Sequence, residues 1–213
     1  MKKLLLLILL IGIIGVGAWY VSQKEPTLPA PKTLPTLESA TLLNPSQTLK
    51  PFSLLDIHQK TFNNASLRGR FTLMFFGYAT CPAVCPKTLA LISTAFEKLP
   101  KTLLESQALQ FVFVSLDPET DTPSVLKMFL KRFNETFIGL TGDEESIEAF
   151  SKNCGIYYWE DKNQTSSIKQ IDHSATLLLF NPKGELQALF TPPYEADILA
   201  RDLNTLITQS SPR

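Results

Sequence analysis

Two short, almost wholly apolar runs constrain the fold of this chain more than any other feature. They are Phe71 to Phe76 and Leu109 to Leu116. Runs of this length and composition are typical of strands buried on both faces of a sheet. Each is followed by apolar residues at helical spacing, so the sequence predicts strands that alternate with helices around a central sheet. In such sheets functional sites cluster at the carboxyl ends of the strands, and Cys81 follows one of those ends.

The rest of the chain completes this α/β pattern. Thr122 and Pro123 supply an N-cap and a first-turn proline for a second helix. A short apolar segment follows at Phe137–Leu140, and a third helix is expected over Glu144–Asn153. Ala175–Phe180 and Glu185–Phe190 are expected to form the two strands of a hairpin, and a last helix is expected over Glu195–Ile207. The predicted fold is therefore an α/β sandwich with a mixed central sheet flanked by helices, which is the arrangement of a thioredoxin-like fold.

The amino terminus predicts a membrane anchor. Lys2 and Lys3 precede Leu4 to Val21, which is 18 residues without a charge, at the short end of the roughly 17 to 25 that span a bilayer as a helix. Two lysines before the run and none directly after it predict a cytoplasmic start and an exported remainder. We therefore expect a single-pass protein of the bacterial inner (cytoplasmic) membrane with its domain in the periplasm. A cleaved signal peptide is the alternative, because Gly15 to Ala18 supplies small residues near a cleavage point.

Composition divides the rest of the chain and excludes one class of partner. Five prolines between Ser22 and Pro45 indicate an extended, semi-rigid spacer. The predicted division is an anchor or signal peptide (1–21), a proline-rich linker (22–45), a folded domain (46–208) and a tail (209–213). Basic and acidic residues both number 20, so no excess of positive charge points to nucleic acid.

Two cysteines, Cys81 and Cys85, follow the first strand four residues apart, and each precedes a proline. Positions i and i+4 share a helix face, and the amides at a helix N-terminus favour thiolate over thiol. Because Pro86 would clash with the carbonyl of Pro82 inside a regular helix, we expect an irregular turn through Cys85 and a helix that begins at Pro86. Three uses of the pair are open at this point: a structural disulfide, a redox-active dithiol, and two thiolate ligands for a soft metal.

A histidine far downstream offers a third ligand. His173 lies immediately before the predicted strand at Ala175, and from there it can approach the cysteine loop. Two thiolates and one imidazole suit Cu(I) and could also hold Cu(II). A hydrogen-bonded structural histidine is the alternative, and the residues alone leave both interpretations open. The other histidine of the chain, His58, occupies a polar turn and is predicted to be solvated.

Three further features have structural interpretations. The loop Asp117–Pro123 supplies a turn and a helix cap, with a role in shaping the edge of the site as the alternative. Cys154 ends a predicted helix and is expected to be a buried, inert thiol. The aromatic residues Tyr157–Trp159 are expected to lie in a strand and in the core, with a docking surface as the alternative.

Three motifs carry a resemblance to a known family, and they stand in the order Phe76-Gly77-Tyr78-Ala79-Thr80-Cys81-Pro82-Ala83-Val84-Cys85-Pro86, Ser115-Leu116-Asp117-Pro118-Glu119-Thr120-Asp121-Thr122-Pro123 and Asp172-His173-Ser174-Ala175. Together they resemble the SCO/SenC family of copper-binding cytochrome c oxidase assembly proteins. The resemblance covers the chain from about Leu49 to Thr205. The family usually has His at the place of Thr80 and Asp at the place of Ala83, so this chain departs from the pattern at two positions.

The resemblance implies a thioredoxin-like fold in which Cys81, Cys85 and His173 bind a copper ion. It also implies a metallochaperone that delivers copper to the dinuclear copper site of cytochrome c oxidase subunit II, or that reduces the thiols of that site. A disulfide cannot bind copper, so a periplasmic thiol reductant is an expected partner, and another copper carrier could supply the metal. The alternative function is a thiol-disulfide oxidoreductase or peroxidase-like redox protein that uses Cys81 and Cys85 without metal.

Overall fold

The computed structural model describes Trp19, residues 37–160 and residues 170–210. The chain divides into two compact units, Met1–Leu34 and Pro35–Arg213, and the sheet lies in the second. The predicted anchor, apart from Trp19, and most of the proline-rich linker lie outside the described residues. Within those residues, no helix is both long and apolar enough to cross a membrane.

Strands and helices alternate along most of the second unit. The strands are β1 (Ala40–Thr48), β2 (Ser53–Asp56), β3 (Thr61–Asn63), β4 (Phe71–Gly77), β5 (Leu109–Ser115), β6 (Ile138–Thr141), β7 (Tyr158–Glu160), β8 (Ile171–His173), β9 (Leu177–Phe180) and β10 (Glu185–Phe190). The helices are the 3-10 turn η1 (Asn64–Leu67) and the α-helices α2 (Val84–Glu97), α3 (Lys101–Glu105), α4 (Pro123–Lys131), α5 (Glu144–Asn153) and α6 (Ala196–Ser210).

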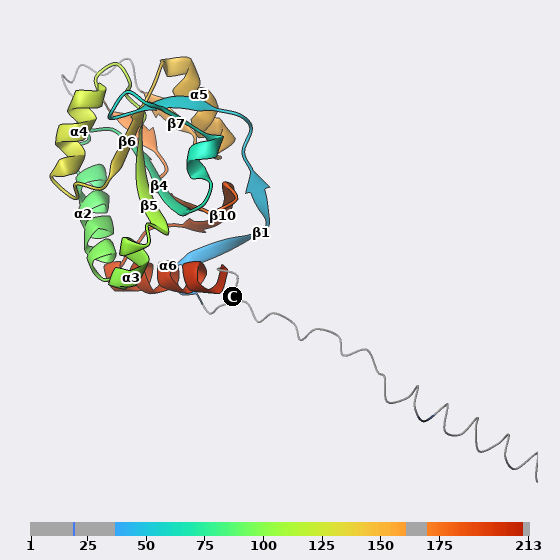
Figure 1. The fold of residues 1–213 in the computed structure, drawn as a ribbon. Coiled ribbons are helices and arrows are strands. Elements are labelled where there is room, and N and C mark those ends of the chain that lie inside the picture. Colours follow the sequence, from blue (N-terminus) through green and yellow to red (C-terminus); the bar gives the residue numbers. More distant parts are fainter. Residues whose placement is uncertain (1–18, 20–36, 161–169, 211–213) are drawn as a thin grey trace, which may run out of the picture. The chain divides into compact units, whose positions relative to one another are not determined.

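A mixed eight-stranded sheet forms the centre of the domain (Figure 1). Its strand order is β1-β10-β9-β4-β5-β6-β2-β3, and β4, β5 and β6 run parallel at its middle. Antiparallel strands adjoin this centre on both sides, because β9 pairs with β4 and β2 pairs with β6. Helix α2 packs against α6, and α4 packs against β6. The predicted α/β class, with a mixed central sheet flanked by helices, is confirmed.

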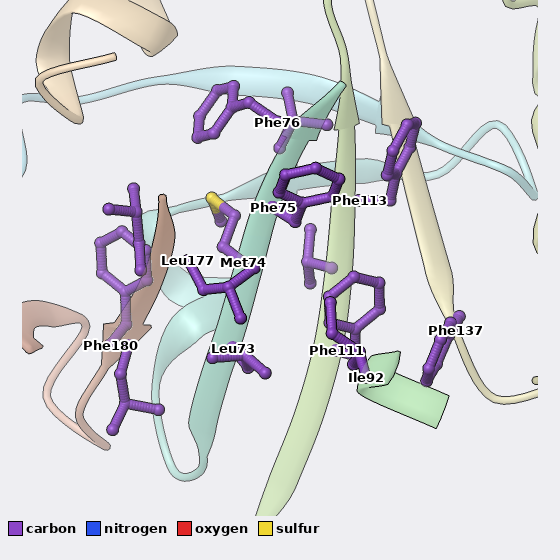
Figure 2. Close-up of a cluster of buried hydrophobic side chains, with 14 of the residues drawn as sticks. Leu73, Met74, Phe75, Phe76, Ile92, Phe111, Phe113, Phe137, Leu177 and Phe180 are labelled. Atoms are coloured by element: carbon purple, nitrogen blue, oxygen red, sulfur yellow. The ribbon is translucent and has the colours of Figure 1, made fainter. Parts of the chain in front are cut away.

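The core is built on β4 and β5, and Figure 2 shows the apolar side chains along both strands. Every residue of β4 is buried, as expected for a strand covered on both faces. The parallel register sets Phe75 opposite Phe113, and their ring centroids lie 6.0 Å apart. Burial of one such side chain stabilises the fold by about 1.5–3 kcal/mol. The two apolar runs from which the fold was predicted are therefore its central strands.

Local signals also predicted the later elements well. Helix α4 begins at Pro123, and the hydroxyl of its N-cap residue Thr122 accepts a hydrogen bond from the Val125 N–H. Helix α5 has the predicted bounds, and the predicted hairpin is formed by β9 and β10. Cys154 is buried and His58 is exposed, both as expected.

Helix α2 begins at Val84, so the predicted start at Pro86 is wrong by two residues. A proline in the first turn costs no hydrogen bond, because the first four N–H groups of a helix have no partner within it. The ladder of i to i−4 bonds begins with the Lys87 N–H and the Ala83 carbonyl, 3.3 Å apart. Cys85 therefore lies in the first turn of α2 rather than in an irregular loop.

The folded domain also begins before the predicted boundary at Ser46. Strand β1 starts at Ala40 and pairs antiparallel with β10. Pro45, which composition assigns to the linker, lies where the register of this pair shifts, between Leu42 and Gln47. A strand tolerates a residue without an N–H at such an irregularity, so the proline does not exclude pairing.

A buried carboxylate in α6 anchors this first strand. Asp202 is fully buried, and its Oδ2 accepts hydrogen bonds from the N–H groups of Glu38, Ser39 and Ala40 at 3.0, 2.8 and 3.2 Å. The Ser39 hydroxyl donates to the same oxygen. The chain is therefore attached to the domain from residue 38 onwards.

The expectation for the aromatic residues Tyr157–Trp159 is only partly right. Residues from Tyr158 lie in β7, but Tyr157 is 72% exposed and Trp159 is 67% exposed, so neither belongs to the core. The reason is that β7 pairs with β8 in a separate two-stranded sheet and is not part of the central one. The period-2 alternation of a strand exposes one of its faces when nothing packs on it.

Candidate metal centre

The three predicted ligands come from two segments that meet at the carboxyl end of β4. Cys81 lies in the connection from β4 to α2, and Cys85 lies in the first turn of α2. His173 is the last residue of β8, opposite Tyr158, a short strand that the sequence did not predict. Tyr78 joins the two segments, because its hydroxyl oxygen accepts a hydrogen bond from the Ile171 N–H at 3.4 Å.

Backbone amides at the start of α2 surround the sulfur of Cys81. The Cys85 N–H donates to Cys81 Sγ at 3.5 Å, and the amides of Ala83 and Val84 act in the same way. Partial burial of Cys81 opposes ionisation, but these donors outweigh it and hold the pKa of the thiol below its ordinary value. Cys81 is therefore the thiol that ionises more readily, and it is partly accessible from outside.

Cys85 has the opposite character. It is fully buried, and burial, followed by the neighbouring charges of Cys81 and Asp121, raises the pKa of its thiol far above the ordinary value. The space around its sulfur depends on a glycine: a Cβ at Gly77 would lie 2.7 Å from Cys85 Sγ and 3.0 Å from the Phe113 ring. The absence of a side chain at position 77 thus leaves room for the sulfur of Cys85.

The imidazole of His173 faces the same sulfur. Its Nε2 lies 3.8 Å from Cys85 Sγ, and its Nδ1 lies 2.9 Å from the carbonyl oxygen of Ser174. A carbonyl oxygen can only accept, so Nδ1 carries the ring proton and the lone pair of Nε2 faces the cysteines. Burial lowers the pKa of His173, which keeps the ring neutral near pH 7. A neutral imidazole with its second nitrogen hydrogen-bonded is the usual state of a metal-ligating histidine.

The structure thus brings His173 and Cys85 together and sets Cys81 beside Cys85. None of the three cysteines is joined in a disulfide in this structure. Across the part of the chain that the structure describes, no group of three His, Cys, Asp or Glu side chains is close enough to hold a metal ion without rearrangement. Three-coordinate binding therefore requires a further approach of these side chains.

Sequence reasoning assigned no separate role to several residues that shape this site. Gly77, Tyr78, Ser115 and Asp121 are buried around it and connect its segments. The predicted loop carried the only signal for Asp121, and both interpretations of that loop hold: Thr122 caps α4, while Asp121 accepts a hydrogen bond from the Ala79 N–H in the cysteine loop. Nothing in the local sequence indicated that Asp121 would reach Ala79, because 42 residues separate them.

Comparison with known proteins identifies the family. The sequence pattern of the SCO1/SenC family matches residues 40–208. This chain belongs to the SCO1/SenC family. The resemblance carried by the three motifs is therefore confirmed, and the match begins where β1 begins rather than at the predicted boundary near Ser46.

Relatives and solved structures of this SCO1/SenC protein agree with the match. The SCO2-like protein of Rickettsia prowazekii is 30% identical over 204 residues, which are 94% of each protein. The structure of Bradyrhizobium japonicum ScoI with copper bound is 31% identical, has a TM-score of 0.66, and covers 74% of this chain and 98% of that one. Apo Sco1 from Thermus thermophilus is also 31% identical, with a TM-score of 0.71 and coverage of 82% and 99%. The fold is thus the thioredoxin-like fold of the Sco proteins.

Proposed function

We propose that this protein is a membrane-tethered copper metallochaperone that holds copper through Cys81, Cys85 and His173. The observation that carries the proposal is the orientation of His173, whose Nε2 lone pair faces Cys85 Sγ at 3.8 Å while Nδ1 is bonded to a carbonyl. In the metal-free protein the Cys85 S–H can donate to Nε2, and loss of that proton on metal binding would leave both atoms as ligands. Relatives whose structures contain bound copper support the choice of metal.

The donor set fits copper as a transported ion. Thiolate and imidazole are soft or borderline ligands, which favour Cu(I) and can also hold Cu(II). Copper binding would draw the proton from Cys85 despite its raised pKa, since metal ligands bind as thiolates. With only three ligands, the ion would stay open to attack by a ligand of the recipient, so it could be transferred by exchange.

The recipient that we propose is the dinuclear copper site of cytochrome c oxidase subunit II. Membership of the SCO1/SenC family supports this choice. Thr80 and Ala83, where the family usually has His and Asp, are exposed, and Ala83 still contributes its backbone amide to Cys81. The two departures therefore affect the surface that a partner would meet more than the ligands themselves.

The proposed setting is the periplasmic face of the bacterial inner membrane, with residues 1–21 as the anchor. A periplasmic thiol reductant would keep Cys81 and Cys85 reduced, and another copper carrier could load the site. The tether would hold the domain near a membrane-bound recipient, which raises its effective concentration there.

A second candidate function rests on the asymmetry of the thiols. Cys81 is partly exposed with a lowered pKa, and Cys85 is buried with a raised pKa. An accessible thiolate beside a buried thiol is the arrangement of a dithiol that attacks a disulfide and then resolves the mixed disulfide. Such a protein would reduce disulfides without metal, and His173 would be dispensable.

Copper titration of the reduced, full-length protein in detergent tests the proposal and separates the two functions. We expect one copper per chain, and we expect C81S, C85S and H173A each to weaken binding by at least about tenfold. H58A is the matched control, because His58 is the other histidine and lies in an exposed turn. Unchanged copper binding in H173A would reject the three-ligand site. Disulfide reduction that persists in metal-free H173A would favour the second function.

A further inference from the structure

A buried carboxylate connects the cysteine loop to the end of β5. Asp121, in the loop before α4, is fully buried. Its Oδ2 accepts hydrogen bonds from the Ser115 hydroxyl at 2.6 Å and from the Ala79 N–H at 3.0 Å. The Ser115 hydroxyl oxygen in turn accepts from the Asp117 N–H at 3.0 Å. One carboxylate oxygen thus joins three segments: the end of β5, the loop before α4, and the connection that carries Cys81.

We propose that Asp121 is a positioning residue for the copper site, which holds the loop before Cys81 and whose negative charge favours Cu(II) over Cu(I) at that site. This inference rests on the proposed function, since it assumes that Cys81, Cys85 and His173 bind copper. It assigns Asp121 a role other than ligation, which it exerts through its hydrogen bonds with the Ser115 hydroxyl and the Ala79 N–H.

The positioning follows from where Ala79 lies. Ala79 is two residues before Cys81, inside a turn in which the Cys81 N–H donates to the Tyr78 carbonyl at 3.3 Å. The bond from Ala79 to Asp121 fixes the orientation of this turn. Metal–ligand distances in a formed site vary by only about 0.2 Å, so the orientation of the turn that leads to Cys81 affects copper affinity.

The preference for Cu(II) follows from the charge count. Two thiolates, a neutral imidazole and Cu(I) carry a net charge of −1, whereas the same ligands with Cu(II) are neutral. A neighbouring anion therefore destabilises the Cu(I) form more than the Cu(II) form. The carboxylate lies close to the site, because its Oδ2 accepts a hydrogen bond at 3.0 Å from the N–H of Ala79, two residues before Cys81.

The test uses D121N and S115A in the full-length protein. In D121N the amide oxygen can still accept both hydrogen bonds, but the charge is lost, so the ratio of Cu(II) affinity to Cu(I) affinity should fall about tenfold. A tenfold fall in this ratio corresponds to a rise of about 59 mV in the midpoint potential of bound copper. In S115A the carboxylate loses the donor that shares its charge, so we expect the ratio to rise about threefold. D197N is the matched control, because Asp197 is an exposed acid on α6 that forms an ion pair with Lys98.

The measurement is an anaerobic potentiometric titration of the copper-loaded proteins, with Cu(I) affinity from chelator competition and folding from circular dichroism. Shifts in opposite directions in D121N and S115A, with none in D197N, would support the proposal. If the wild-type protein binds copper and D121N has the same ratio of Cu(II) affinity to Cu(I) affinity, the role of Asp121 is overturned and the proposed function stays intact. A wild-type protein that binds no copper would overturn the proposed function itself. If D121N does not fold, S115A decides, and an unchanged or lower ratio in S115A would reject the inference.

Discussion

Replacement of Gly77 by alanine should weaken copper binding through the position of one sulfur atom. The added Cβ would lie 2.7 Å from Cys85 Sγ and 3.0 Å from Cε2 of Phe113, and ordinary contacts begin near 3.4 Å, so the sulfur must recede by about 0.7 Å. A metal site tolerates displacements of about 0.2 Å. We therefore expect the affinity for copper to fall by at least about tenfold, the scale on which a misplaced ligand weakens a site.

The same substitution should also destabilise the fold. Added volume in a packed core costs about 1–3 kcal/mol, and a domain of this size loses about 2–4 °C of melting temperature per kcal/mol. A loss of about 6 °C is therefore expected for G77A. The assays are a thermal melt of the metal-free protein and a chelator competition for Cu(I).

Gly139 provides the matched control for this experiment. A Cβ there would lie 2.8 Å from Ile57 and 2.9 Å from Leu130, where α4 packs on β6, so G139A crowds the core to a similar extent. Neither neighbour is a predicted ligand, and copper affinity of G139A should equal that of the wild-type protein. The reasoning would be refuted if G77A bound copper as tightly as the wild-type protein, or if G139A lost the same affinity.

Three further predictions concern the thiols, the histidine and the anchor of β1. Alkylation of the metal-free protein near pH 8 should modify Cys81 faster than a free cysteine, because the pKa of Cys81 is lowered. Cys85 and Cys154 should stay unmodified unless the protein unfolds, because burial raises the pKa of both thiols, and mass spectrometry would show the difference. Burial lowers the pKa of His173 from its ordinary 6.5, so the unfolded chain binds the proton more tightly and the free energy of unfolding should fall as the pH drops below about 6.5. Denaturant melts of H173Q should lack this loss of stability at low pH. An identical pH dependence in both proteins would contradict the lowered pKa of His173. D202A leaves the amides of Glu38, Ser39 and Ala40 without their acceptor, which should cost about 1–3 kcal/mol in urea unfolding, whereas D197N should change the free energy of unfolding by less than about 1 kcal/mol.

Much of the fold could be predicted because its signals are local. The apolar runs that became β4 and β5 are buried on both faces, so their composition alone indicated strands in the middle of a sheet. Thr122 and Pro123 marked the start of α4 by capping chemistry that involves neighbouring residues only. The errors also have local causes. Proline normally interrupts a helix or a strand, but Pro86 and Pro45 each lie where the structure needs no N–H donor. Pro86 is in the first turn of α2, and Pro45 is where the register of β1 shifts.

The candidate site, like the fold, could be predicted from the sequence only in part. The spacing of Cys81 and Cys85 and the downstream His173 named three candidate ligands, which stay a prediction, and all three lie within the residues that the family match covers. The environment of each residue was not predictable: the amides around Cys81, the burial of Cys85 and the tautomer of His173 depend on which atoms surround them in the folded chain. Asp121 was visible only as part of a turn, although its partner is the cysteine loop.

The amino-acid sequence by itself therefore determined the class of fold, its central strands and most of its helices, the family, and the candidate ligands, because periodicity, caps and motifs are properties of neighbouring residues. Only the tertiary structure decided that His173 Nε2 faces Cys85, that the two thiols differ in burial, and that Tyr157 and Trp159 are exposed. Those outcomes depend on how β8 pairs with β7 and how α2 leaves β4, and contacts between segments this far apart are set by packing rather than by any local pattern.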